Sequence, residues 1–140
     1  MEFRAHNQTV LYNCEEGDLL EFERGMYSHW GVFIGDGNVV HLTGQNDGIK
    51  DDIGNPTHLF SVWGKQFSKA EVKCDDFWDI VSHCKAKINN KDSNGRTALS
   101  KSKIVENALS KLGKIGYNVL WYNCEHFAHW CRYGEEKSDQ

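Results

Sequence analysis

Apolar runs of strand length mark the first third of the chain. Residues 30–34 and 38–42 flank the turn sequence Gly35-Asp36-Gly37, which predicts an antiparallel hairpin. Residues 19–22 predict an earlier strand that ends at the turn-prone pair Arg24-Gly25. The pattern therefore predicts an antiparallel sheet close to the N-terminus.

The middle of the chain has weaker patterns. Residues 59–63 and 70–74 predict short strands, whereas residues 75–90 mix both periodicities and stay unassigned. Residues 44–56 and 89–95 are loops by composition, since they are rich in Gly, Asn and Asp.

A first helix is predicted by one apolar face, with Ser100 or Ser102 as its N-cap and Gly113 at its end. Its apolar face is formed by Ile104, Val105, Ala108, Leu109 and Leu112, which share helical spacing. We expect this helix to be mainly structural.

A second helix is predicted from the N-cap residue Asn123 to Gly134, with Glu125 in its first turn. Its buried face would carry Cys124, Phe127, Ala128 and Cys131. Unsatisfied N–H groups at a helix start favour a thiolate over a thiol and can also stabilise an oxyanion. Cys124 is therefore a candidate nucleophile, with Asn123 and Glu125 as supporting residues, although a lone buried cysteine is more commonly an inert small hydrophobe.

A base for this thiol is predicted in the hairpin. A three-residue loop at 35–37 pairs Ile34 with Asn38 and brings His29 and His41 to one face as diagonal neighbours. A two-residue turn would place them on opposite faces. On a shared face, His41 could orient His29 as the general base of a Cys-His-His site.

Composition narrows the functional classes. The 140 residues, 39% hydrophobic and 26% charged, predict one domain spanning 1–140. The net charge of −4 gives no overall attraction to nucleic acid, so we expect no such partner. The five cysteines lack a Cys-x-x-Cys pair, and residues 1–7 lack a signal-peptide core, so a cytoplasmic rather than secreted protein is expected. Asn7-Gln8-Thr9 matches a glycosylation acceptor, which we interpret as a chance pattern.

Two blocks of sequence resemble a known family. Residues 17–21, 29–37 and 39–42 are similar to the histidine block of the lecithin:retinol acyltransferase superfamily. Asn123-Cys124-Glu125-His126-Phe127 and the later Arg132-Tyr133-Gly134 are similar to its cysteine block. The order of the blocks and the twelve residues from His29 to His41 also match, over a core of about 17–134.

This resemblance implies an α+β, permuted papain-like thiol hydrolase fold, with an antiparallel sheet packed against the cysteine helix. It implies that Cys124 takes a fatty acyl group from a glycerophospholipid as a thioester and that His29, polarised by His41, transfers the proton. Water, an amine or a lysolipid would accept the acyl group in the phospholipase A and acyltransferase branch, which the chain resembles more than the retinol branch. Retinol O-acylation is the alternative, and neither needs a cofactor.

A lipid substrate implies contact with a membrane surface by an otherwise monomeric protein. Four aromatic residues are candidates for contact with substrate or membrane: Tyr27, Trp30, Trp63 and Phe67. No window of 18 consecutive apolar residues exists in this sequence. Membrane-bound members of the family carry a C-terminal hydrophobic anchor, so a longer natural chain is one interpretation of the end at Gln140.

Two rival interpretations come from other classes. Cys124, His126, His129 and Cys131 could suggest a metal site, but only His126 and His129 have the i, i+3 spacing that converges on a helix, so no metal is expected. A non-catalytic interaction domain that keeps both motifs is the stronger rival.

Overall fold

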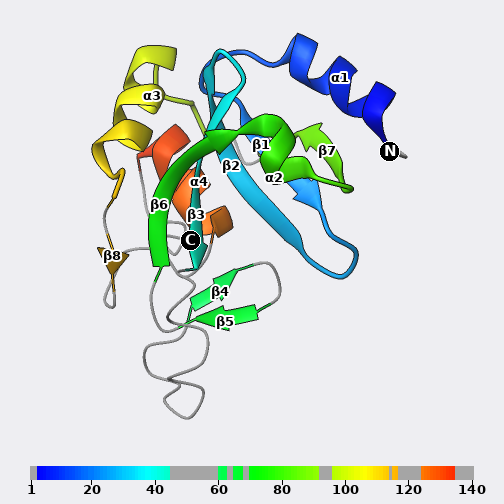
Figure 1. Ribbon diagram of the computed structural model, residues 1–140. Helices are drawn as coiled ribbons and strands as arrows, with labels where there is room; N and C mark the ends of the chain where they lie inside the picture. The colour runs from blue at the N-terminus through cyan, green and yellow to red at the C-terminus, as the bar shows by residue number, and fades with distance from the viewer. Residues whose placement is uncertain are drawn as a thin grey trace.

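The computed structural model describes residues 3–44, 60–62, 65–67, 70–91, 96–113, 115–116 and 124–134, with side chains described for 3–43, 71–91, 96–113 and 124–134. Among these residues an antiparallel sheet has the order β7-β1-β2-β3-β6-β8 (Figure 1). Its strands are β1 (Leu19–Glu23), β2 (Ser28–Gly35), β3 (Asn38–Gly44), β6 (Ala70–Asp76), β7 (Lys85–Ile88) and β8 (Ile115–Gly116). The remaining elements are the hairpin β4 (Phe60–Val62) and β5 (Lys65–Phe67) and the helices α1 (Arg4–Asn13), α2 (Phe77–Val81), α3 (Lys101–Ser110) and α4 (Cys124–Tyr133). The predicted α+β class is confirmed.

The sheet separates two hydrophobic cores because alternate residues of each strand face opposite sides. On one face α3 and α4 pack over a cluster that includes Leu19, Val32, Leu42, Cys124 and Phe127. On the other face α1 and α2 pack over a cluster made of Val10, Leu20, Phe22, Phe33, Val39, Phe77, Ile80, Val81 and Ala86. Figure 1 shows α2 and α4 on opposite sides of the sheet. Residues one position apart in β2 therefore belong to different cores.

The β2–β3 hairpin has the predicted register but a different turn. Gly35 pairs with Asn38, so the turn contains two residues, and both Asp36 (φ +55°) and Gly37 (φ +77°) have the positive φ of a type I′ turn. A β-bulge between Phe33 and Gly35 shifts the register by one residue. The expectation of a three-residue loop is therefore wrong, yet Gly31 still opposes His41 because the bulge offsets the shorter turn.

Both C-terminal helices form where the sequence predicts them. Ser100 is the N-cap of α3 and accepts a hydrogen bond from the Lys103 N–H. The helix ends at Ser110, somewhat before Gly113. In α4 the predicted face is buried, and Gly134 follows the helix in a left-handed conformation (φ +72°). The N-cap prediction for Asn123 lies outside the described residues.

Several segments differ from the sequence pattern or lie beyond the described residues. The unassigned segment 75–90 contains the end of β6, α2 and β7. The predicted strand at 70–74 is confirmed and extends to Asp76, whose carboxylate accepts the Trp78 N–H to cap α2. The predicted strand at 59–63 corresponds to β4, whereas the loop at 45–56 is outside the described part of the chain.

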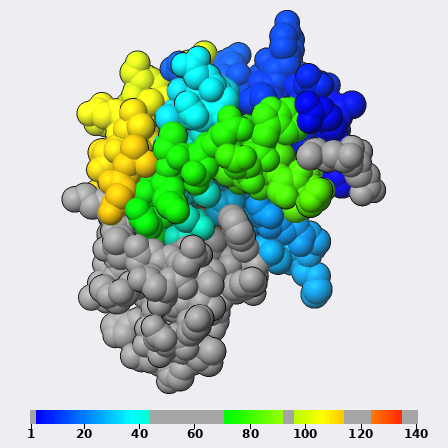
Figure 2. Space-filling view, viewed as in Figure 1, coloured from blue at the N-terminus to red at the C-terminus, as the bar shows by residue number. Residues whose placement is uncertain are grey.

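Helix α1 is not predicted by the sequence pattern, and it docks through a buried amide. Asn7 is fully buried, donates to the Cys84 carbonyl at 2.9 Å and accepts the Ala86 N–H at 2.9 Å. His6 Nε2 lies 2.7 Å from the Ala86 carbonyl. Figure 2 shows α1 beside α2 on the viewed face. Burial of Asn7 agrees with the interpretation of Asn7-Gln8-Thr9 as a chance glycosylation pattern.

Replacement of Asn7 by alanine is expected to destabilise the protein by about 2–3 kcal/mol, because the buried N–H of Ala86 and the partly buried carbonyl of Cys84 would lose their partner. Urea unfolding monitored by tryptophan fluorescence measures the change. Asn13→Ala is the matched control, since Asn13 is exposed at the end of the same helix. Equal stability of the two variants would contradict the anchoring role of Asn7.

Within the part of the chain that the structure describes, every helix is too short or too polar to cross a bilayer.

Candidate active site

His29 and His41 meet on the α2 side of the sheet. The Nε2 atom of His29 lies 2.8 Å from Nδ1 of His41, and the two rings are nearly perpendicular at 84°. His29 is fully buried, and His41 is 2% exposed. Gly31 separates them on this face, and a Cβ at Gly31 would lie 2.4 Å from Cγ1 of Val39. A glycine is therefore needed where the two strands carry the paired imidazoles.

Cys124 contacts the backbone on both sides of His29. Its Sγ lies 3.9 Å from the Ser28 carbonyl oxygen, and the N–H of Trp30 also donates a hydrogen bond to the sulfur. Cys124 is 3% exposed at the start of α4. The first residue of α4 thus lies against the backbone of the first residues of β2.

The strand pairing explains why this contact is possible. Phe33 exchanges backbone hydrogen bonds with the segment 17–18, so the backbone groups of Trp30 and Ser28 point away from β1, towards β3. Among the described residues, however, the β2–β3 ladder ends at the pair Gly31 and His41. The sulfur of Cys124 therefore contacts the Ser28 carbonyl and the Trp30 N–H, which would otherwise pair with the backbone of a β3 residue.

Burial dominates the protonation state of Cys124. It raises the pKa of the thiol to about 11, although the backbone N–H groups of Trp30, Cys124 and Glu125 partly oppose this by donating to the sulfur. The helix N–H groups favour the thiolate, as expected, but the net shift is upward because desolvation outweighs them. The thiol is protonated at neutral pH and requires a base before it can attack.

The alkylation rate of Cys124 by iodoacetamide is expected to rise about tenfold per pH unit from pH 7 to pH 9 and to keep rising at pH 10, because only the thiolate reacts. Peptide mapping by mass spectrometry after timed exposure measures the rate at this cysteine. Protein unfolded in urea is the control and should react faster at pH 8. A plateau below pH 8 would show an acidic thiol and contradict the expected direction.

Both imidazoles are neutral at pH 7. Burial lowers the pKa of His29 well below its ordinary value, and the nearby charges of His41 and Arg24 act in the same direction. Burial also lowers the pKa of His41, while the Asp75 carboxylate opposes that shift. A neutral His29 can accept a proton, which is the state that a general base requires.

The hydrogen-bonded chain has a third member that the sequence pattern does not predict. Asp75 Oδ2 lies 2.7 Å from Nε2 of His41. The β3–β6 register pairs Val39 with Asp75 and His41 with Lys73, so Asp75 lies diagonally across from His41 on the same face. To predict the role of Asp75, one would need to know that β6 pairs with β3, and a strand pattern alone does not reveal which strands pair.

The supporting residues have different environments. Glu125 forms an ion pair with Lys91, whose Nζ also lies 5.0 Å from the centre of the Trp30 ring. Trp30 is only 5% exposed and packs in the core, so it offers no surface to a lipid here. Tyr27 is 37% exposed beside the fully exposed Met26, in the turn between β1 and β2 that projects from the molecule (Figure 2). Asn123, Trp63 and the side chain of Phe67 lie outside the described residues.

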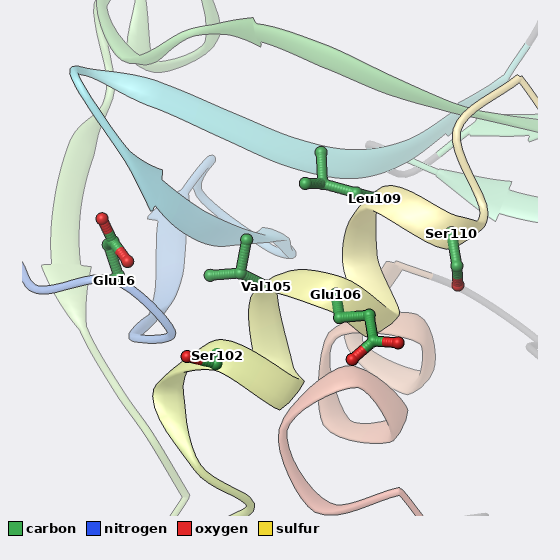
Figure 3. A pocket seen from close by; sticks show the side chains of 6 residues that line it. All are labelled: Glu16, Ser102, Val105, Glu106, Leu109 and Ser110. Atoms are coloured by element: carbon green, nitrogen blue, oxygen red, sulfur yellow. The ribbon is translucent and has the colours of Figure 1, made fainter.

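A cavity of about 570 Å³ runs along α3 (Figure 3), and neither histidine of the pair lines it. Its lining residues are Glu16, Ser102, Val105, Glu106, Leu109 and Ser110. None of them is a predicted site residue. In the part of the chain with described side chains, no group of three or more His, Cys, Asp or Glu residues is arranged to hold a metal ion.

Comparisons with known proteins agree with the two sequence blocks. The family model of lecithin retinol acyltransferase matches residues 12–137. Phospholipase A and acyltransferase 3 of Homo sapiens is 35% identical over 125 residues, which cover 89% of this chain and 74% of the relative. Phospholipase A and acyltransferase 1 of Mus musculus is 33% identical over 133 residues, covering 94% of this chain and 75% of the relative. Together, the match across most of the chain and these relatives establish that the protein belongs to the lecithin retinol acyltransferase family.

Proposed function

We propose that this protein is a thiol-dependent phospholipid acyltransferase and phospholipase A that works through an acyl-Cys124 thioester. The fatty acyl group would come from a glycerophospholipid and pass to water, an amine or a lysolipid. The names of the relatives support acyltransferase or phospholipase activity in general. The observation that carries the finer proposal is the contact of Cys124 with the peptide groups on both sides of His29, which is itself hydrogen-bonded to His41.

In the acylation half-reaction, His29 removes the proton of the Cys124 thiol as sulfur attacks the ester carbonyl carbon. The tetrahedral intermediate then expels the lysophospholipid oxygen, which receives the proton from His29. His41 orients His29 and shares its positive charge while the proton is held. The raised thiol pKa favours this coupled transfer over a thiolate that exists before substrate arrives.

In the second half-reaction, the acceptor attacks the thioester and His29 removes its proton. Collapse of the intermediate breaks the C–S bond and returns that proton to the sulfur of Cys124. Water releases a free fatty acid, an amine gives an amide, and a lysolipid hydroxyl gives a new ester. The backbone N–H groups at the start of α4 that reach the sulfur are candidate donors to the oxyanion, with Asn123 and Glu125 as supporting residues.

The proposal includes a permuted papain-like arrangement, in which α4 presents Cys124 to a strand that carries the histidines. We also propose that the protein is a monomer and contacts a membrane surface from the cytoplasm. The exposed pair Met26 and Tyr27 supports the contact, since these two residues directly precede β2, which carries His29, and could enter the headgroup layer.

Intact-protein mass spectrometry after brief exposure to a short-chain phosphatidylcholine tests the proposal. We expect the mass of one acyl group to be added to the wild type and to Cys131→Ala but not to Cys124→Ala. Cys131 is the matched control because it is a buried thiol of the same helix. Absence of the adduct, together with no hydrolysis of the lipid, would favour a non-catalytic interaction domain. Addition of an amine, a lysolipid or retinol to the acylated protein then identifies the acceptor.

A further inference from the structure

The histidine pair continues to the protein surface through Asp75. The chain of hydrogen bonds runs from His29 Nε2 to His41 Nδ1 at 2.8 Å, and from His41 Nε2 to Asp75 Oδ2 at 2.7 Å. The side chain of His41 is 3% exposed, whereas that of Asp75 is 43% exposed. Asp75 is therefore the solvent-facing end of a chain whose other members are buried.

The chemistry of these groups sets the direction of each hydrogen bond. An ionised carboxylate can only accept, so the hydrogen of a neutral His41 must be on Nε2. Its Nδ1 then carries a lone pair and accepts the Nε2–H of His29. A neutral His29 has one ring hydrogen, which leaves the lone pair on Nδ1 to receive a proton.

We propose that Asp75 is a positioning residue that acts through His41 to keep His29 in the tautomer whose Nδ1 can accept the Cys124 proton. This inference rests on the proposed acyl transfer and adds a fourth residue to it. If Asp75 were neutral, either nitrogen of His41 could carry the hydrogen, and part of the protein would hold His29 with its Nδ1 protonated. That fraction could not act as a base.

The charges around His41 show why a carboxylate matters at this position. From β6, Lys73 lowers the pKa of His41, and Arg24 after β1 acts in the same direction. The neighbouring helix α2 presents Asp79, which is exposed. Among the described charged groups that act on His41, Asp75 is the one that favours its protonated form. It can therefore also stabilise positive charge shared by the two rings during proton transfer.

Asp75→Asn tests the inference, since it removes the charge while keeping the size of the side chain. We expect kcat/KM for short-chain phosphatidylcholine to fall about 10- to 100-fold, mainly through kcat, and the acid limb of the pH–rate profile to move to lower pH. Asp79→Asn is the matched control, because it removes the same charge from an exposed position on α2, four residues further along the chain, and should keep both quantities unchanged.

Nitrogen-15 NMR of histidine-labelled protein gives a second measurement that needs no substrate. In the wild type we expect Nδ1 of both His29 and His41 to be unprotonated, and in Asp75→Asn a mixture of tautomers. Unchanged tautomers and an unchanged rate in the variant would overturn the inference. If the wild type forms no acyl adduct, the proposed function fails, and the NMR comparison alone still decides whether Asp75 sets the tautomers.

Discussion

Replacement of Cys124 by serine is expected to lower acyl transfer by at least about 10⁴-fold without unfolding the protein. A serine hydroxyl is far less acidic and less nucleophilic than a thiol, so it should attack the ester carbonyl much more slowly. The substitution exchanges one atom at a buried helix start, so packing of the core should change little. Release of fatty acid from a short-chain phosphatidylcholine measures the loss.

The matched control for this change is Cys131→Ser, which makes the same substitution on the same helix. It should reduce thermal stability but keep turnover in the fraction that remains folded. Cys124→Ser turnover above about one tenth of the wild-type value would remove Cys124 from the mechanism.

Replacement of His29 by asparagine is expected to lower turnover by about 10³-fold or more, whereas His41→Asn should lower it by only about 10- to 100-fold. An amide at position 41 can still accept the Nε2–H of His29 and orient the ring, but an amide at position 29 cannot take a proton at neutral pH. Initial rates at pH 7–8, corrected for the folded fraction from urea unfolding, give the comparison. Equal losses in the two variants would leave the assigned roles without support.

Burial of His29 should also make the stability of the folded protein depend on pH in the acid range. The pKa of His29 in the folded protein lies below its value in the unfolded chain, so the unfolded state binds more protons as the pH falls below about 6.5. The stability that a neutral His29 provides is therefore present above this pH and is lost on acidification. The urea midpoint of His29→Asn should therefore fall less between pH 6 and pH 4 than the urea midpoint of the wild type.

The first three strands and both C-terminal helices are predictable because their apolar periodicity and caps agree with the tertiary packing. That His29 and His41 share a face is also predictable, but the predicted turn is one residue too long and the bulge is not predicted. Asp36 tolerates a positive φ, so the turn contains two residues, and a bulge near Ile34 returns the register to the predicted pairing. A bulge has no residue-type signature strong enough to be expected from one sequence.

Three other features lie outside what the sequence pattern can indicate. Asp75 joins the site only because β6 pairs with β3, a contact between segments that are far apart in the chain. Helix α1 has a weak apolar face and no side-chain N-cap, so it depends on tertiary contacts such as those of Asn7 rather than on its own propensity. The raised pKa of Cys124 cannot be predicted from the local sequence either, because it depends on how deeply the folded core buries the sulfur.

The docking of α1 has a consequence for the solubility of the protein. Strand β7 is at one edge of the main sheet in the described structure, and an uncovered edge is a template for pairing with another molecule. Asn7 and His6 occupy both the N–H and the carbonyl of Ala86, so they act as a substitute for a neighbouring strand. The family match begins at residue 12, after most of α1. Removal of the preceding residues would leave the matched region with an open edge and promote its self-association into β-aggregates.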